Sequence, residues 1–193
     1  QRHSQDHYIE IVRKKSELTG GDILLLVSCS EIISTKDRAP YGVCLVLHAS
    51  DLPRGRGWSP HIWELAAGAS HISLTLLEAE DKVDSGRIWR KVKIPVPPTA
   101  IWDEINHLLF TAEVQLMDFA LASFGNIQPQ EQPKEIEPTY YRQRIPKDSR
   151  IDPQKSLADQ FDLIRVCDPH RFPAFFEYRG QQFVLKLEKF NDE

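Results

Sequence analysis

Two continuous runs of apolar residues stand out in the first quarter of the chain. One covers residues 23–27 (ILLLV), and the other covers residues 43–47 (VCLVL) and leads into His48. Unbroken apolar runs of this length are typical of strands buried on both faces of a parallel sheet. The more polar stretch between them, residues 30–42, predicts a short helix or turn that ends by Pro40.

Further along, apolar and polar positions alternate. Residues 71–79 (HISLTLLEA) and 87–96 (RIWRKVKIPV) both show this period of two. Alternation of this kind is typical of strands that bury one face and leave the other polar. We therefore expect two further strands here.

Two segments show helical signals instead. Ser59 and Pro60 suit the start of a short helix, and Gly68 suits its end. Between Thr99 and Gly125, apolar residues recur every three or four positions, which predicts a long amphipathic helix capped by Thr99. Because strands alternate with helices, this part of the chain is predicted to be an α/β fold.

The composition changes after the long helix. Residues 127–138 (IQPQEQPKEIEP) are rich in proline, glutamine and glutamate, which predicts a linker. The linker would divide a core over residues 1–126 from a small α+β subdomain over residues 139–193. In that subdomain we expect a helix over 153–165 and a hairpin that turns at 179–180.

Composition and charge narrow the function. The chain has 24 basic and 28 acidic residues, and its net charge of -4 argues against a protein that binds nucleic acid by neutralising phosphates. It also gives no reason to expect binding to anionic membranes. No apolar run approaches the roughly 20 residues that span a bilayer. The polar N-terminus has no signal-peptide pattern, so we expect a cytoplasmic protein.

The cysteines give no sign of a disulfide framework. The chain has three of them, Cys29, Cys44 and Cys167. Their number is odd, and no two have the CxxC spacing of a metal or redox site. We expect buried free thiols in a reducing compartment and no metal centre.

Candidate chemistry begins at His48, which follows the second apolar run. In open α/β sheets, ligands bind at the carboxyl ends of the strands, although an ordinary hydrogen-bonded histidine also fits this position. In the following loop, residues 50–57 (SDLPRGRG), the glycines allow close approach to a ligand. The arginines can hold a carboxylate or phosphate. A solvated surface turn fits this loop equally well.

A second polar cluster lies between the two alternating strands. Residues 78–86 (EAEDKVDSG) hold four carboxylates, most of which must be solvated. Asp84 comes where the next strand begins, and its carboxylate could face the same sheet edge as His48. A carboxylate beside an imidazole raises the basicity of the ring and fixes its orientation. The pair therefore suggests acid-base chemistry on an amine or water.

The motifs LHASDLPRGRGWSPHIWELAAG and TLLEAEDKVDSGRIW together resemble the core of the folate-dependent formyltransferases. This family includes methionyl-tRNA, glycinamide ribonucleotide and sugar N-formyltransferases. It carries an Asn-x-His motif, a Ser-Leu-Leu-Pro loop with Arg-Gly or Lys-Gly, and an Asp-[Thr/Ser/Ala]-Gly motif. The positions that match are His48, Ser50, Leu52-Pro53, Arg56-Gly57 and Asp84-Ser85-Gly86.

The likeness covers roughly residues 22–125 and continues in the tail. The stretch YYRQRIPKDSRID resembles the segment that follows the core in sugar N-formyltransferases. The motif WSP and the closing FPAFFEYRGQQFVLKL look most like the branch linked to pseudaminic-acid (nonulosonic acid) synthesis, which serves bacterial surface glycans.

The resemblance implies a Rossmann-like, mostly parallel sheet and an N-formyltransferase. The formyl group would pass from 10-formyltetrahydrofolate to the amine of an amino sugar that we expect to be nucleotide-linked, without a metal. His48 would act as base or oxyanion stabiliser, and Asp84 would orient His48 or a relay water. The implied folate contacts are Leu47, Glu80, Asp81, Val83 and Asp84. The implied sugar contacts are Ser50, Arg54, Arg56, Gly57 and Trp58.

Two features depart from the family pattern. The asparagine of the Asn-x-His motif is Val46 here, and a lost oxyanion donor typically costs on the order of 100- to 1000-fold in rate. Ser28, a backbone N–H of residues 49–57 or protonated His48 could replace it. We also expect this chain to lack the opening β-α unit of the family. That would expose a sheet edge, which a homodimer could cover.

Two alternatives to the sugar enzyme stay open. One is a methionyl-tRNA formyltransferase, against which the acidic balance and the short tail argue. The other is a catalytically inactive module that binds folate or a sugar nucleotide, an interpretation that Val46 supports.

Overall fold

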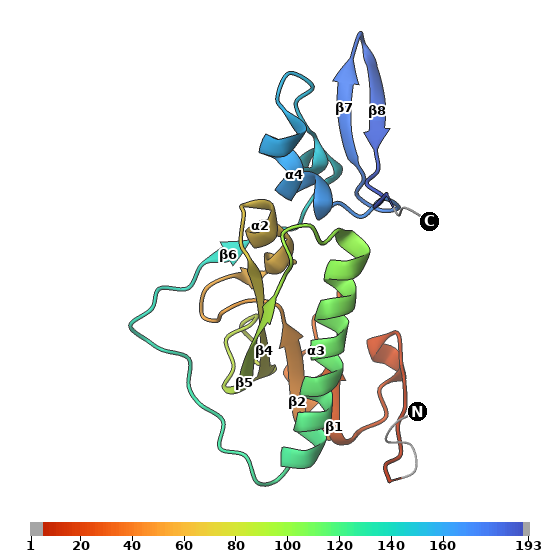
Figure 1. Cartoon of the computed structure of the whole chain (residues 1–193). Coiled ribbons are helices and arrows are strands. Elements are labelled where there is room, and N and C mark those ends of the chain that lie inside the picture. The colour runs from red at the N-terminus through yellow and green to blue at the C-terminus, as the bar shows by residue number, and fades with distance from the viewer. Residues whose placement is uncertain (1–5, 191–193) are drawn as a thin grey trace.

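A four-stranded sheet forms the centre of the molecule in the computed structural model, which describes residues 6–190 (Figure 1). The strand order is β1-β2-β4-β5. Strands β1 (Gly21–Leu26) and β2 (Tyr41–His48) run parallel, joined through the short helix α1 (Thr35–Arg38). Strands β4 (His71–Glu78) and β5 (Ile88–Pro95) are antiparallel to each other, and β4 is antiparallel to β2.

The predicted α/β class is confirmed, and the sheet contains both parallel and antiparallel strand pairs. Of the pairings in the described sheet, only β1 with β2 is parallel. The loop between β4 and β5 spans only residues 79–87, whereas a parallel return needs a crossover of a dozen or more residues. A tight connection of this length therefore produces an antiparallel pair. Strand β1 ends the sheet among the described residues.

Two helices flank the sheet as the sequence pattern predicts. Helix α2 (Pro60–Ala66) follows Ser59, and the long helix α3 (Trp102–Ser123) packs along β4 and β5 (Figure 1). The predicted cap at Thr99 is wrong. The N-cap is Ile101, because its N–H donates to the Glu104 carboxylate at 2.9 Å and leaves the helix to start at Trp102.

The core lies between α3 and the sheet. Apolar side chains on the inner face of β4 meet those of α3 that recur at helical spacing. Its fully buried members include Leu45, Ile72, Leu74, Leu76, Ile105 and Leu116. This packing fixes the ends of β2 and β4, from which the polar loops extend.

Most of the remaining elements follow the predicted linker. Strand β6 (Tyr140–Tyr141) pairs in parallel with the short strand β3 (Arg56–Gly57). Helix α4 (Leu157–Arg165) packs on α2. It starts later than predicted because the Ser156 side chain accepts the N–H of Asp159 and caps it. Short 3-10 helices cover Lys15–Glu17 and Pro146–Ser149.

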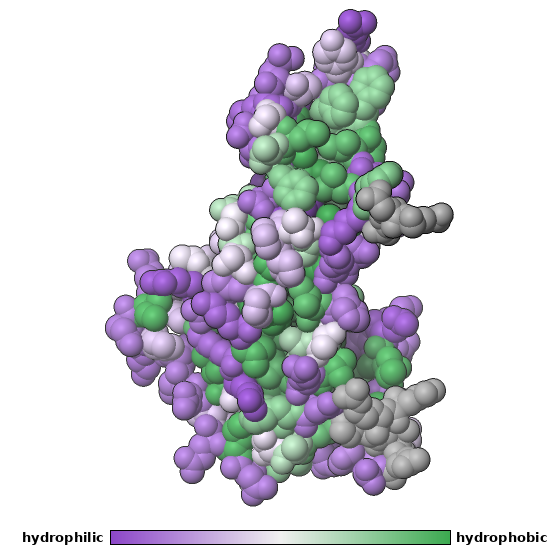
Figure 2. Space-filling model, viewed as in Figure 1, coloured by the Kyte–Doolittle hydropathy of each residue, from purple (hydrophilic) through white to green (hydrophobic). Residues whose placement is uncertain are grey.

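A hairpin of β7 (Ala174–Tyr178) and β8 (Gln181–Leu185) closes the described chain. It turns at Arg179 and Gly180 as predicted, and both have positive φ. Figure 1 shows the hairpin standing beyond α4, and Figure 2 shows apolar side chains gathered over this region. A separate small apolar cluster lies beneath it, formed around Ile151, Ile164, Cys167 and Ala174.

The cysteine prediction is correct for two of three thiols. All three cysteines are free, and Cys44 and Cys167 are buried. Cys29 is exposed because β1 ends at Leu26, three residues earlier. Across residues 6–190, no helix has both the length and the apolar character needed to cross a membrane.

Helix α3 buries one carboxyl group, that of Glu113, with only 6% of the residue exposed. Burial raises the pKa of Glu113 to about 7, because the charged form loses its hydration. The folded state therefore favours the protonated form. The contribution of Glu113 to stability is complete below the unfolded pKa of 4.5 and is lost as the pH rises through about 7.

We expect Glu113→Gln to raise the free energy of unfolding at pH 8 by at most about 3 kcal/mol and to leave it nearly unchanged at pH 4. Urea unfolding at the two pH values measures this difference. Glu135→Gln, which changes an exposed carboxylate, is the control. An equal gain at both pH values would contradict the interpretation.

Candidate active site

His48 and Asp84 lie side by side at one end of the sheet. His48 is the last residue of β2, and Asp84 lies in the loop between β4 and β5. Nε2 of His48 is 3.5 Å from Oδ2 of Asp84, and both side chains are buried. The expectation that these two groups face the same sheet edge is confirmed.

The imidazole of His48 has a second partner in the loop that follows β2. Its Nε2 lies 2.8 Å from the carbonyl oxygen of Gly55. Because a carbonyl oxygen only accepts hydrogen bonds, Nε2 carries the hydrogen in this arrangement. In the neutral ring, Nδ1 then holds the lone pair that can take up a proton.

Asp84 is held from the other side by the same loop. Its Oδ2 accepts the backbone N–H of Gly57 at 2.9 Å. Asp84 itself has a φ of 53°, in the left-handed region, which a non-glycine residue adopts only where its surroundings require it. The loop after β2 thus contacts both members of the pair.

Gly57 permits this contact because no side chain fits there. A Cβ at Gly57 would lie 2.4 Å from the carbonyl oxygen of Tyr141, and φ is +95°. Gly86 is equally restricted, since a Cβ there would lie 2.0 Å from the Glu78 carbonyl oxygen. Both glycines therefore allow backbone segments to approach closely around Asp84.

We expect Gly57→Ala to lower the free energy of unfolding by about 2 to 3 kcal/mol, from the left-handed backbone and the clash with Tyr141. Gly125→Ala is the matched control, because Gly125 has a φ of +80° with nothing within 4 Å of an added Cβ. It carries the backbone cost alone, about 1 kcal/mol. Chemical denaturation of both variants measures the difference, and equal losses would argue against the close contact.

The loop after β2 also anchors itself to β4. The backbone N–H of Ser50 donates to the His48 carbonyl at 2.9 Å, and the Thr75 hydroxyl donates to the Ser50 carbonyl at 2.7 Å. Thr75 is fully buried, although the alternating pattern placed it on the polar face of its strand. Its burial is explained by this hydrogen bond.

Three buried side-chain atoms in this region lack a hydrogen-bond partner. They are Oγ of Ser50, Nε of Arg56 and Nδ1 of His61, and they are the only such atoms among residues 6–190. Burial, together with the nearby His48, lowers the pKa of His61 to about 4, so this imidazole is neutral at pH 7. Buried polar groups are normally paired, so these three enclosed atoms are exceptions in the packing around His48.

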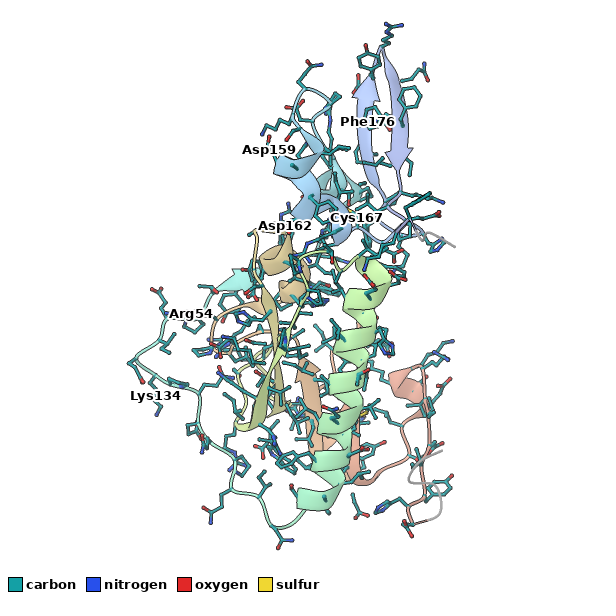
Figure 3. The ribbon with its side chains drawn as sticks, viewed as in Figure 1. Arg54, Lys134, Asp159, Asp162, Cys167 and Phe176 are labelled. Carbon is teal, nitrogen blue, oxygen red and sulfur yellow. The ribbon has the colours of Figure 1, made fainter. Side chains whose placement is uncertain are left out.

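The predicted sugar contacts separate into two groups. Ser50 and Arg56 are buried, and the Arg56 guanidinium donates to Gln132 at 2.6 Å and to Tyr140 at 3.2 Å. Trp58 is exposed, as is Arg54, which Figure 3 shows on the same side of the molecule as Lys134 of the linker. Gly57 is occupied by its hydrogen bond to Asp84.

The predicted folate contacts are similarly mixed. The Leu47 side chain packs in the core, so only its main chain is left for a ligand. Asp81 accepts a hydrogen bond from Thr35 at 2.6 Å and pairs with Arg38 at 2.6 Å, and these contacts lower its pKa. Glu80 and Val83 are exposed, and the Asp84 carboxylate is buried against His48.

The predicted linker makes hydrogen bonds to the sheet and to the loops around His48 and Asp84. Figure 1 shows it passing from α3 along the outer side of the sheet, and the backbone of Gln130 pairs with Ile88. Directly after the linker, the Thr139 hydroxyl accepts the N–H of Gly55 at 2.9 Å. Gln132 is buried beside Asp84. Sequence patterns missed these contacts because single polar residues in a proline-rich stretch carry no periodic signal.

No group of three or more histidine, cysteine, aspartate or glutamate side chains in the described part of the chain could hold an ion. At His48 and Asp84, a buried imidazole is fixed by a carbonyl oxygen and a carboxylate, which is an arrangement that can perform acid-base chemistry.

Solved structures share this fold. A methionyl-tRNA formyltransferase from Clostridium thermocellum superposes with a TM-score of 0.76 and 24% identity, over 93% of this chain and 80% of that one. A sugar N-formyltransferase from a Shewanella species gives a TM-score of 0.67 and 18% identity, over 89% and 71%. HypX from Aquifex aeolicus, in complex with tetrahydrofolic acid, gives 0.68 and 19%, over 86% and 29%.

At these identities the structures show a shared fold. The sequence itself carries the assignment further, because residues 2–121 match the formyl transferase family over more than half of the chain. His48, Asp84 and the loop between β2 and α2 all lie within the matched region. The chain therefore belongs to the formyl transferase family and is a formyltransferase.

Proposed function

We propose that this enzyme transfers a formyl group from 10-formyltetrahydrofolate to the amine of a nucleotide-linked amino sugar. The proposal rests on the buried His48–Asp84 contact of 3.5 Å at the end of the sheet. Acyl transfer to an amine requires a group that removes a proton from the attacking nitrogen. His48 is suitably placed for that role.

The residues around His48 fit a polar heteroaromatic cosubstrate. Ser50 and His61 carry unpaired polar atoms near His48, and Val83 offers exposed apolar surface. We propose that the loop with Glu80, Asp81, Val83 and Asp84, together with the main chain of Leu47, holds the folate. When bound, 10-formyltetrahydrofolate supplies the electrophilic formyl group.

The protein groups then have separate tasks. His48 keeps Nε2–H directed at the Gly55 carbonyl and uses Nδ1 to accept the proton of the attacking amine. The Asp84 carboxylate, 3.5 Å from Nε2, stabilises the imidazolium that forms. Gly57 N–H holds that carboxylate in place. The proton can later pass from His48 to the leaving nitrogen.

The absence of the family asparagine at Val46 requires another donor for the developing oxyanion. The parallel register pairs Leu26 with Val46, so two residues further along, Ser28 comes to the same end of the sheet as His48. Ser28 has a φ of 48° and is exposed. We propose Ser28, or a backbone N–H of residues 49–57, as the substitute donor.

The sugar is the favoured acceptor class on the basis of charge. The chain has more acidic than basic residues, 28 against 24, whereas tRNA binding relies on neutralising phosphates. We further propose the branch that acts in pseudaminic-acid synthesis, on the likeness of WSP and the closing hairpin sequence. Methionyl-tRNA is the second candidate because the likeness to the Clostridium enzyme covers 93% of this chain.

A single-turnover experiment tests the proposal. Purified protein is mixed with 10-formyltetrahydrofolate and either a panel of nucleotide-linked amino sugars or methionyl-tRNA, and the products are read by mass spectrometry. We expect one formyl group on a sugar and none on the tRNA. Formylation of the tRNA alone would replace the sugar by the second candidate. Folate binding without transfer to any acceptor would indicate a binding module.

A further inference from the structure

The side chain of Gln132 connects three segments that are distant in the sequence. Its Nε2 donates to the carbonyl oxygens of Asp84 and Gly86, both at 2.9 Å. Its Oε1 accepts from the Arg56 guanidinium at 2.6 Å. The residue is only 9% exposed. One amide therefore joins the linker, the Asp84 loop and the loop after β2.

Every polar group of the Gln132 side chain takes part in a hydrogen bond. A primary amide has two N–H donors and an oxygen acceptor, and here both donors meet carbonyls while the oxygen meets a cation. A carboxylate has no donor for the two carbonyls, and an apolar side chain would satisfy none of the three partners. Losing them would leave buried polar groups unpaired.

Gln132 contacts Asp84 at a point where the backbone conformation is unfavourable. With a φ of 53°, Asp84 occupies a conformation that persists only when its surroundings determine it. Gln132 fixes the Asp84 carbonyl from one side, while Gly57 N–H fixes the Asp84 carboxylate from the other. The side chain and the main chain of Asp84 are thus tied to different segments.

Arg56 completes this arrangement from inside the protein. It is 5% exposed, and no acidic side chain among the described residues forms an ion pair with it. Its partners are neutral: the Gln132 oxygen and the Tyr140 hydroxyl at 3.2 Å. Charged donors make the stronger hydrogen bonds, so Arg56 orients the Gln132 amide with its donors toward Asp84 and Gly86.

We propose that Gln132 is a positioning residue for formyl transfer, which holds Asp84 against His48 and is itself oriented by Arg56. The inference rests on the proposed role of the His48–Asp84 pair. It also replaces the sugar contact implied for Arg56 by a role within the protein. Gln132 acts through Asp84 and touches no reacting atom.

The first test measures amide hydrogen exchange by mass spectrometry and needs no substrate. In Gln132→Met, which keeps the side-chain length but has no donor or strong acceptor, we expect exchange in residues 79–87 to be at least about tenfold faster. Gln130→Met is the matched control, because its side chain is exposed and only its backbone pairs with Ile88. Unchanged exchange in residues 79–87 of the Gln132 variant would overturn the proposal.

Gln132→Glu separates the two ends of the amide. Glutamate can pair with Arg56, but its carboxylate has no hydrogen to donate to the carbonyl oxygens of Asp84 and Gly86. We expect exchange in residues 79–87 to increase at least as much as in Gln132→Met. A mild effect would mean that the contact with Arg56 is the one that counts, and it would overturn the role assigned to the Asp84 loop.

The second test is a kinetic double-mutant cycle on the acceptor that the wild-type enzyme formylates. We expect Gln132→Met to lower kcat about tenfold with KM changed less than threefold, and to have no further effect in an Asp84→Asn background. Losses that multiply instead would indicate a merely structural role. If the wild type formylates no acceptor, the proposed function fails, while the exchange experiments still decide whether Gln132 holds the loop.

Discussion

Replacing His48 by glutamine is expected to reduce kcat for formyl transfer by about a thousandfold, because general acid-base catalysis contributes on the order of 100- to 10,000-fold. Glutamine can still donate an N–H toward the Gly55 carbonyl, which the His48 Nε2 contacts at 2.8 Å. It has no nitrogen lone pair that can accept a proton at neutral pH. The variant therefore removes the base while keeping a donor for its neighbour.

The experiment measures single-turnover rates at saturating cosubstrate, with thermal unfolding to confirm that the fold is intact. His107→Gln is the control, because His107 is exposed on α3 and lies outside the two loops that hold His48 and Asp84. We expect it to keep the wild-type rate. A His48→Gln enzyme that retains more than about a tenth of the wild-type rate would remove His48 from the proposed role.

Asp84→Asn is expected to lower kcat about a hundredfold with a smaller change in KM, because it removes the negative charge that lies 3.5 Å from the His48 ring. The substitution suits the backbone. Asparagine tolerates the left-handed conformation that Asp84 adopts at a φ of 53°, and its amide oxygen can still accept the Gly57 N–H. The expected loss of rate thus measures the effect of the negative charge of Asp84, because asparagine keeps the backbone conformation and the hydrogen bond.

Comparison with Asp84→Ala sharpens this result. Alanine also removes the acceptor for Gly57 and is strained at positive φ, so we expect a lower stability in addition to the lower rate. Asp103→Asn, on the exposed side of α3, controls for the loss of one carboxylate from the protein. An Asp84→Asn rate within threefold of wild type would show that the charge has no part in the reaction.

The kinetic effect of Val46 can be separated from these two residues. Val46 lies on β2, two residues before His48, where the family resemblance places an asparagine. If Ser28 or a loop N–H already supplies the oxyanion donor, restoring the asparagine adds a second donor beside an existing one. An enzyme that instead lacked any donor would gain strongly in rate from that change.

The sequence by itself determined the local elements and the two residues at the centre of the site. The apolar run before His48 and the alternation over β4 and β5 are local patterns. The spacing of apolar residues is enough to predict strands of this kind. The short loop before β5 then carries Asp84 to the same edge as His48. Local pattern and motif spacing together were enough to pair them.

Only the tertiary structure decided how this pair is held. Arg56 appears in the sequence as a cation on a glycine-rich loop, yet it lies inside and binds Gln132, 76 residues away. Gln132 itself lies in a stretch whose composition indicates a linker. Hydrogen bonds of this kind depend on which segments meet after the core has packed. The spacing of residues around a single polar side chain does not predict a partner so far along the chain.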